Sequence, residues 1–169
     1  MHISKYIIIT GLILLLLMTN TSQAESLIAF WEAKKLKAYK DIGGVWTIGW
    51  GSTFNYDANR PVLPSDVIDD ATALRWLRHE IANKQVEIKK LVKVPLSQNQ
   101  IDSLTSFAYN IGINAFKNST LLKLLNAGNN KLMVADQFMI WNKITKDGKK
   151  IVSNGLTNRR KAERELFLK

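Results

Sequence analysis

Residues 36–53 read LKAYKDIGGVWTIGWGST, and this stretch decides the fold class of the chain. Its aromatic and β-branched residues favour strands, and its glycines permit tight turns and close backbone approach. We therefore predict a small antiparallel hairpin or meander here. Because the residues that follow show helical spacing instead, the expected architecture is α+β, with a small sheet near the start and a helical lobe after it.

Apolar residues at three- and four-residue spacing predict helices on both sides of this stretch. Asp69 is the expected N-cap of a long helix, and Ser97 with Gln100 forms a capping box at the start of another. The dipeptide Asp147-Gly148 predicts a hairpin-like turn. The predicted helices cover residues 26–35, 70–92, 97–111, 120–127, 131–141 and 156–168.

The composition narrows the possible functions. The chain has 169 residues, which suits one domain, and 46% of them are hydrophobic, so wholesale disorder is excluded. It has no cysteine, which excludes disulfides, thiolate zinc sites and a cysteine nucleophile. Its two histidines argue against a multi-histidine metal site. The formal net charge of +10 predicts a polyanionic partner, which is nucleic acid, an anionic membrane face or a cell-wall polymer.

Residues 1–24, MHISKYIIITGLILLLLMTNTSQA, have the pattern of a secretory signal. As a helix, the apolar run Tyr6–Met18 would span roughly 20 Å, which is less than the roughly 30 Å hydrocarbon core of a membrane. We predict cleavage after Ala24, and the alternative is an uncleaved, weakly held membrane anchor. In both cases residues 25–169 form an exported domain, for which an anionic wall is a more natural partner than nucleic acid.

Glu32 and Asp41 are the candidate catalytic carboxyls. Glu32 follows Phe30 and Trp31, and a carboxylic acid next to aromatic surface favours its neutral form. Asp41 opens the glycine-rich turn, where a wetter setting keeps a carboxylate ionised. Glycosidic bond cleavage requires two carboxyls in unlike settings, one to protonate the leaving oxygen and one to handle water or the sugar cation. On composition and spacing alone, two solvated surface acids are the simpler explanation.

The surrounding sequence changes this balance. The pattern E-(x)8-D-(x)5-T, formed by Glu32, Asp41 and Thr47 with GVWTIGWG at 44–51, closely resembles the phage-type lysozymes, the endolysins of glycoside hydrolase family 24. The resemblance continues in the same order over nearly the whole exported domain. Further segments that resemble the family's central helices and C-terminal signature are 106–112, 116–128 and 155–163.

The resemblance implies a lysozyme-like fold and an exported muramidase that hydrolyses the β-1,4 bond between N-acetylmuramic acid and N-acetylglucosamine in peptidoglycan. Glu32 would be the general acid, Asp41 would position or deprotonate the attacking water, and the Thr47 hydroxyl would hold this water. The family is taken to invert at the anomeric carbon, which needs a carboxyl separation of about 6.5–9.5 Å. No cofactor and no metal are implied. The expected partners are peptidoglycan and anionic cell wall, with transient membrane contact through the N-terminal segment, no nucleic acid, and a monomeric state.

The resemblance also suggests residues around the catalytic group. Substrate contacts are assigned to Trp50, Asn110 and Ser119. Core packing is the alternative for the tryptophan, and helix-end polar contacts are the alternative for the other two. Ser52 stands where the family commonly has histidine, and it is left out of the site.

One of the two arginines Arg159 and Arg160 is expected to form a salt bridge towards Glu32. The alternative is an exposed pair that touches the anionic wall or solvent. Two other functions stay open. A lytic transglycosylase would cut the same bond with a single Glu, although Asp41 and Thr47 in register argue against it. A non-catalytic cationic protein would bind the wall or disrupt membranes.

Overall fold

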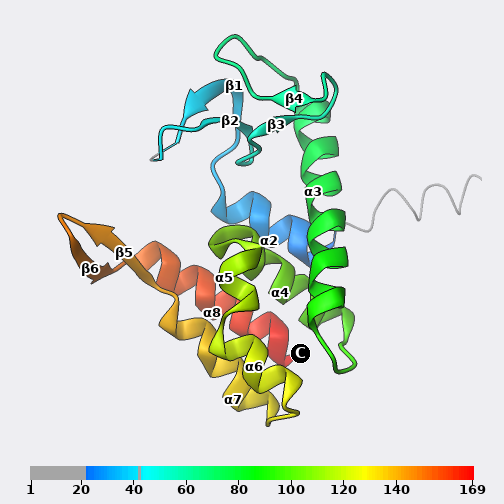
Figure 1. The fold of residues 1–169 in the computed structure, drawn as a ribbon, viewed down its shortest axis with the longest axis vertical. Coiled ribbons are helices and arrows are strands. Elements are labelled where there is room, and N and C mark those ends of the chain that lie inside the picture. The colour runs from blue at the N-terminus through cyan, green and yellow to red at the C-terminus, as the bar shows by residue number, and fades with distance from the viewer. Residues whose placement is uncertain (1–21, 42) are drawn as a thin grey trace, which may run out of the picture.

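The structure is a computed structural model that describes residues 22–41 and 43–169. Short strands form a small lobe at one end of the molecule, and most of the helices gather in a larger lobe at the other end (Figure 1). The long helix α3 (Asp70–Leu91) runs from the small lobe along the larger one. This arrangement confirms the predicted α+β class and the predicted order of sheet and helices.

The small lobe contains the predicted hairpin. Its strands are two antiparallel pairs, β1 (Lys35–Lys40) with β2 (Trp46–Gly49), and β3 (Phe54–Asn55) with β4 (Arg60–Pro61). In the first pair Tyr39 lies opposite Thr47. The turn that follows β1 is closed by Asp41, whose backbone N–H donates to the Val45 carbonyl at 2.9 Å. The second pair was not predicted, because two residues per strand are too few for a periodic signal.

The helical elements besides α3 are α2 (Gln23–Trp31), α4 (Gln98–Ile111), α5 (Ile113–Lys117), α6 (Thr120–Asn126), α7 (Lys131–Asp136), the 3₁₀ helix η1 (Gln137–Ile140) and α8 (Asn154–Leu168). The predicted caps are confirmed: Asp69 accepts from the Thr72 N–H at the start of α3, and Ser97 forms the capping box with Gln100. α4 ends at Gly112, whose φ of 85° suits glycine.

Three helix predictions need correction. The first helix was predicted over residues 26–35, whereas α2 spans Gln23–Trp31 and Lys35 already belongs to β1. The helix predicted over residues 131–141 is α7 followed by η1, so its second half winds more tightly. The five-residue α5 lies where no helix was predicted. The turn at Asp147-Gly148 joins β5 (Lys143–Lys146) to β6 (Lys149–Val152), and both turn residues have positive φ, as a two-residue hairpin loop requires. This hairpin projects from the larger lobe (Figure 1).

The main hydrophobic core lies in the larger lobe. Four buried phenylalanines from four elements meet there, and their rings contact one another edge-on or tilted: Phe107, Phe116, Phe138 and Phe167. Helices α4 and α8 pack together through this core. Polar side chains of α4 and α8 also meet, and they belong to the site described below.

The first described residues are built into the domain. Ser22 caps the N-terminus of α2, the Gln23 N–H donates to Asp102 Oδ2 on α4 at 3.1 Å, and Ala24 is completely buried. The predicted cleavage after Ala24 would therefore fall inside α2. Residues 1–21, which hold the apolar run predicted to direct export, lie outside the described residues. In the described part of the chain, no helix is both long and apolar enough to cross a membrane.

Candidate active site

Glu32 lies where α2 ends and the chain turns towards β1. It is the C-cap residue, and its N–H donates to the Ile28 carbonyl at 2.9 Å. Its side chain is 28% exposed, so solvent reaches the carboxyl although most of the side chain is covered. The prediction that Phe30 shields this acid is wrong, because the Phe30 ring is itself 76% exposed.

Asp41 lies on the surface at the end of β1, in the wetter setting that was predicted. Its Oδ1 accepts from the Val45 N–H at 2.8 Å, which fixes the carboxylate on the turn. Thr47, in β2, is buried, and its hydroxyl donates to the Val45 carbonyl at 3.1 Å. Since this bond uses the hydroxyl's only proton, the Thr47 oxygen keeps only its role as an acceptor.

The charges of both candidate carboxyls affect the pKa of Tyr39. It lies on β1, two residues before Asp41 and opposite Thr47. Partial burial raises the pKa of the Tyr39 phenol, and the charges of Glu32 and then Asp41 raise it further. The charges of both carboxylates therefore act on the Tyr39 phenol.

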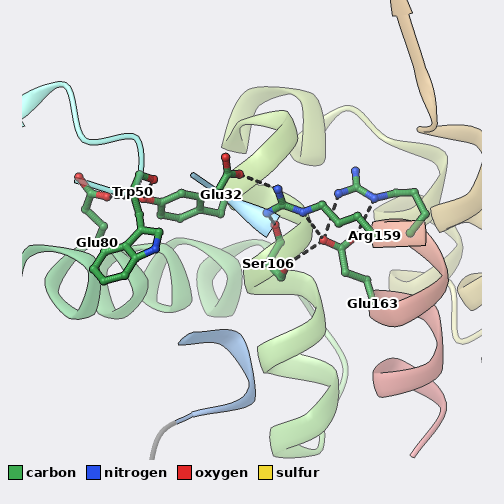
Figure 2. Close-up of polar contacts among 8 residues, drawn as sticks. Glu32, Trp50, Glu80, Ser106, Arg159 and Glu163 are labelled. Carbon is green, nitrogen blue, oxygen red and sulfur yellow. Dashed lines mark hydrogen bonds and ion pairs between the residues drawn. The ribbon is translucent and has the colours of Figure 1, made fainter. Parts of the chain in front are cut away.

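Arg159, on α8, holds the Glu32 carboxylate from the larger lobe (Figure 2). Its Nη1 donates to Glu32 Oε1 at 2.6 Å, its Nη2 to the Ser106 carbonyl at 3.3 Å, and its Nε to Glu163 Oε1 at 3.1 Å. Arg159 is only 3% exposed, so each of its three nitrogens is committed to a protein oxygen in a mostly dry setting. The salt bridge expected from one of the two arginines is thus made by Arg159.

The other arginine, Arg160, binds Glu163 instead of Glu32. Glu163 Oε1 accepts from Arg160 Nη2 at 3.0 Å and from Ser106 Oγ at 2.7 Å, while Oε2 lies 2.7 Å from Arg160 Nε. Glu163 and Arg160 are both completely buried. Burial raises the pKa of Glu163, against the lowering effect of the two guanidiniums, and burial lowers the pKa of Arg160.

Tyr109 joins the small lobe to α3 and α4 next to this group. The Tyr109 hydroxyl lies 2.7 Å from Glu80 Oε2 on α3 and 3.0 Å from the Trp50 carbonyl oxygen. Burial and then the charge of Glu80 raise the pKa of Tyr109, so the phenol stays a neutral donor.

The three predicted substrate contacts lie in different settings. The Trp50 ring packs on the small apolar cluster around Ile28 and Leu77, with Lys34 Nζ 5.2 Å from its centroid. Asn110 lines a cavity of about 500 Å³ together with residues of η1, α8 and the β5–β6 hairpin. Ser119 is buried, and its hydroxyl is used to cap α6.

Sequence reasoning gave no role to Glu163, Tyr109 or Glu80. A signal for Glu163 was present, because it follows Arg159 by four residues and Arg160 by three, and residues at these spacings share one helix face. No such signal links Tyr109 to Glu80, since the two belong to different helices. Their contact follows only from how α3 and α4 pack.

Comparisons with known proteins agree with the observed fold. The family model described as phage lysozyme matches residues 29–163. An endolysin of Acyrthosiphon pisum secondary endosymbiont phage 1 is 42% identical over 141 residues, which are 83% of this chain and 92% of the relative. An endolysin of Salmonella phage P22 is 40% identical over 137 residues, which are 81% of this chain and 89% of the relative. Among solved structures, an endolysin from Escherichia coli O157:H7 phage FAHEc1 superposes with a TM-score of 0.77 at 38% identity, covering 88% of this chain and 92% of that one.

Proposed function

The chain belongs to the phage lysozyme family, and we propose that Glu32, Asp41 and Thr47 perform its reaction. The family makes the chain a lysozyme-type glycoside hydrolase, a muramidase that degrades peptidoglycan. The bond cut is the β-1,4 link between N-acetylmuramic acid and N-acetylglucosamine. The comparisons do not favour the lytic transglycosylase considered as an alternative.

One observation supports the residue roles above all others: the two carboxyls lie in unlike settings. Glu32 is partly covered and paired with Arg159, whereas Asp41 is exposed and bound to a backbone N–H. The charges of both reach Tyr39. Carboxyls whose surroundings differ in this way can divide the tasks of acid and base between them.

In the proposed reaction Glu32 starts protonated and gives its proton to the glycosidic oxygen as the bond from that oxygen to the anomeric carbon breaks. A water molecule attacks the anomeric carbon from the opposite face, and its proton passes to Asp41. Because Arg159 stabilises the ionised carboxylate that Glu32 becomes, it favours the proton transfer in this direction.

Thr47 is proposed to hold the attacking water. Its hydroxyl proton is committed to the Val45 carbonyl, so its oxygen accepts a hydrogen from the water and leaves the second hydrogen for Asp41. Val45 thereby orients both groups, since its N–H holds Asp41 and its carbonyl holds Thr47. A fixed water of this kind lowers the entropic cost of the displacement.

For substrate binding we propose Trp50 and Asn110. Asn110 supports this role best, because it lines a cavity and keeps a polar side chain at the end of α4. The Trp50 side chain is only half-buried, which leaves part of its ring for a sugar. Ser119 is better assigned to capping, because its hydroxyl already donates to the Phe116 carbonyl and accepts from the Leu122 N–H.

Endolysins act on the cell wall, so peptidoglycan is the partner of this enzyme. We further propose that residues 1–24 direct export and that the enzyme works as a monomer. The substrate lies outside the cytoplasmic membrane, and the apolar run at 6–18 has the composition of an export signal. The burial of Ala24 favours processing ahead of Ser22, or retention of the segment, over cleavage after Ala24.

The products of digestion test the proposed reaction. Purified peptidoglycan is incubated with the full chain, and the soluble fragments are weighed by mass spectrometry. Hydrolysis predicts fragments that each gain one water and end in a reducing N-acetylmuramic acid. Fragments that instead end in a 1,6-anhydro sugar would overturn the roles of Asp41 and Thr47, because that reaction uses no positioned water.

A further inference from the structure

A second carboxylate, that of Glu163, lies near the proposed acid and is not exposed to solvent. Glu163 is completely buried on α8, where its Oε1 takes hydrogen bonds from Arg159, Arg160 and Ser106. Its backbone carbonyl accepts a further bond from Ser103 Oγ at 2.6 Å. A carboxylate this deep needs such partners, because an unpaired buried charge is strongly unfavourable.

The charges of this group do not cancel in every state of the enzyme. Arg159 and Arg160 contribute two positive charges, and Glu163 contributes one negative charge. With Glu32 ionised the group is neutral, and with Glu32 protonated it carries one net positive charge. Protonating Glu32 therefore works against its surroundings, and the size of this penalty depends on how well Glu163 offsets the two guanidiniums.

We propose that Glu163 is a positioning residue that sets the pH range in which Glu32 can act as the proton donor. It acts in two ways through Arg159. Its Oε1 holds Arg159 Nε, which aims Nη1 at Glu32, and its negative charge keeps the cluster from presenting two uncompensated cations to the acid. This inference rests on the proposed role of Glu32 as the general acid.

Several charged or titratable groups enter this balance, and the charge of Asp41, the second proposed catalytic carboxyl, is one of them. Arg159 and Arg160 face Glu32 from α8, Tyr109 faces it from α4, and Tyr39 faces it from β1. The two tyrosines have raised pKa values and are neutral over the working pH range. Glu163 is thus the one anion in the Glu32–Arg159–Arg160 cluster that the reaction itself does not use.

The test is the pH dependence of kcat/KM on purified peptidoglycan at constant ionic strength. Glu163→Gln keeps an oxygen for Arg159 but removes the negative charge, so the protonated form of Glu32 becomes less stable. The alkaline limb of the profile should move to lower pH by at least about half a pH unit. Arg160→Met removes a positive charge and should move the same limb to higher pH. The double variant, which removes the pair together, should lie near the wild type.

Two control variants separate this effect from a merely structural one. Glu165→Gln makes the same charge change on the exposed side of α8 and should leave the alkaline limb in place. Ser106→Ala removes a hydrogen bond to Glu163 without changing any charge, and should lower stability without moving the limb. Thermal unfolding is recorded for each variant. If Glu163→Gln does not fold, the test rests on Arg160→Met. A shift of its alkaline limb to higher pH then supports the inference, and any other result overturns it.

An alkaline limb that stays in place in both Glu163→Gln and Arg160→Met, or that moves in the same direction in both, overturns the inference. Glu32→Gln is measured alongside as the test of the proposed function. If Glu32→Gln keeps wild-type activity, the assignment of the acid itself fails. If Glu32→Gln is inactive and the alkaline limbs of Glu163→Gln and Arg160→Met stay in place, only the role of Glu163 fails.

Discussion

At Asp41 one side chain has two tasks, because its carboxylate both orders a turn and is proposed to receive a proton. The Val45 N–H bond occupies Oδ1 and leaves Oδ2 free of any protein donor among the described residues. A carboxylate that keeps one oxygen open on an exposed turn is well placed to bind water. The structural and chemical tasks therefore fall on different oxygens of the same group.

Replacing Asp41 with asparagine separates these tasks. Asn keeps an oxygen for the Val45 N–H, so the turn and the unfolding temperature should change little. The loss of the charge removes the base, and kcat should fall by about a hundredfold or more, with a smaller change in KM. Initial rates of peptidoglycan solubilisation check this, with Asp41→Ala as the comparison that also loses the turn contact. A rate close to wild type in Asp41→Asn would remove Asp41 from the mechanism.

Single residues were predictable from the sequence where a motif fixes them. Glu32, Asp41 and Thr47 were named by a family motif and not by spacing alone, and they lie where the motif predicts, at the end of one helix and in the hairpin that follows it. Their roles in the reaction stay a proposal. The surroundings of Glu32 were not predictable. The sequence placed aromatic residues next to it, whereas the structure turns Phe30 outwards and brings Arg159 from the far end of the chain. Contacts across that sequence separation leave no local pattern.

Among the elements, α2 has the most immediate bearing on function, because it ends at Glu32. Its N-terminus is tied to α4 by the Gln23–Asp102 bond, and Glu25 pairs with Arg78 on α3 through a 2.8 Å contact. Anchoring the first turn of a short helix to two other helices restricts where its last residue lies. The position of the acid thus depends on residues that precede the predicted cleavage point.

A chain that begins at Glu25 should therefore be less stable than one that begins at Ser22. It lacks the helix cap, the Gln23–Asp102 bond and the buried Ala24 methyl, which together should cost about 2 kcal/mol. Urea unfolding of the two chains gives the difference. Ser22→Ala in the longer chain isolates the cap and should cost about 1 kcal/mol. Equal stability of the two chains would show that residues 22–24 are dispensable for the fold.

Elements with caps or strong periodicity were predictable, and short elements were not. Asp69, Ser97 and Gly112 mark real helix boundaries because each satisfies or ends a set of backbone groups locally. The pair β3–β4 and the helix α5 consist of two and five residues per element, and tertiary packing rather than propensity holds such pieces. The conversion of the predicted 131–141 helix to 3₁₀ geometry likewise has no sequence marker.

For the whole molecule, the +10 net charge bears on how the enzyme approaches its substrate. A basic muramidase meets an anionic wall, and long-range attraction to that wall should weaken as added salt screens it. The hairpin that follows Glu32 belongs to the small lobe and Arg159 belongs to the larger one, so Glu32 lies where the chain passes between the lobes and is held from the larger one. The surroundings of Glu32 therefore depend on the assembled fold and not on the motif alone.

Glu32 is proposed as the proton donor of a peptidoglycan hydrolase, and its loss should abolish most of the activity. The most direct test measures the loss of turbidity of purified peptidoglycan with the wild-type chain and with Glu32→Gln, each shown by circular dichroism to be folded. Removing a general acid should slow clearing by roughly 10² to 10⁴ or more. Equal clearing by the two proteins would contradict the account and would favour a non-catalytic cationic protein instead.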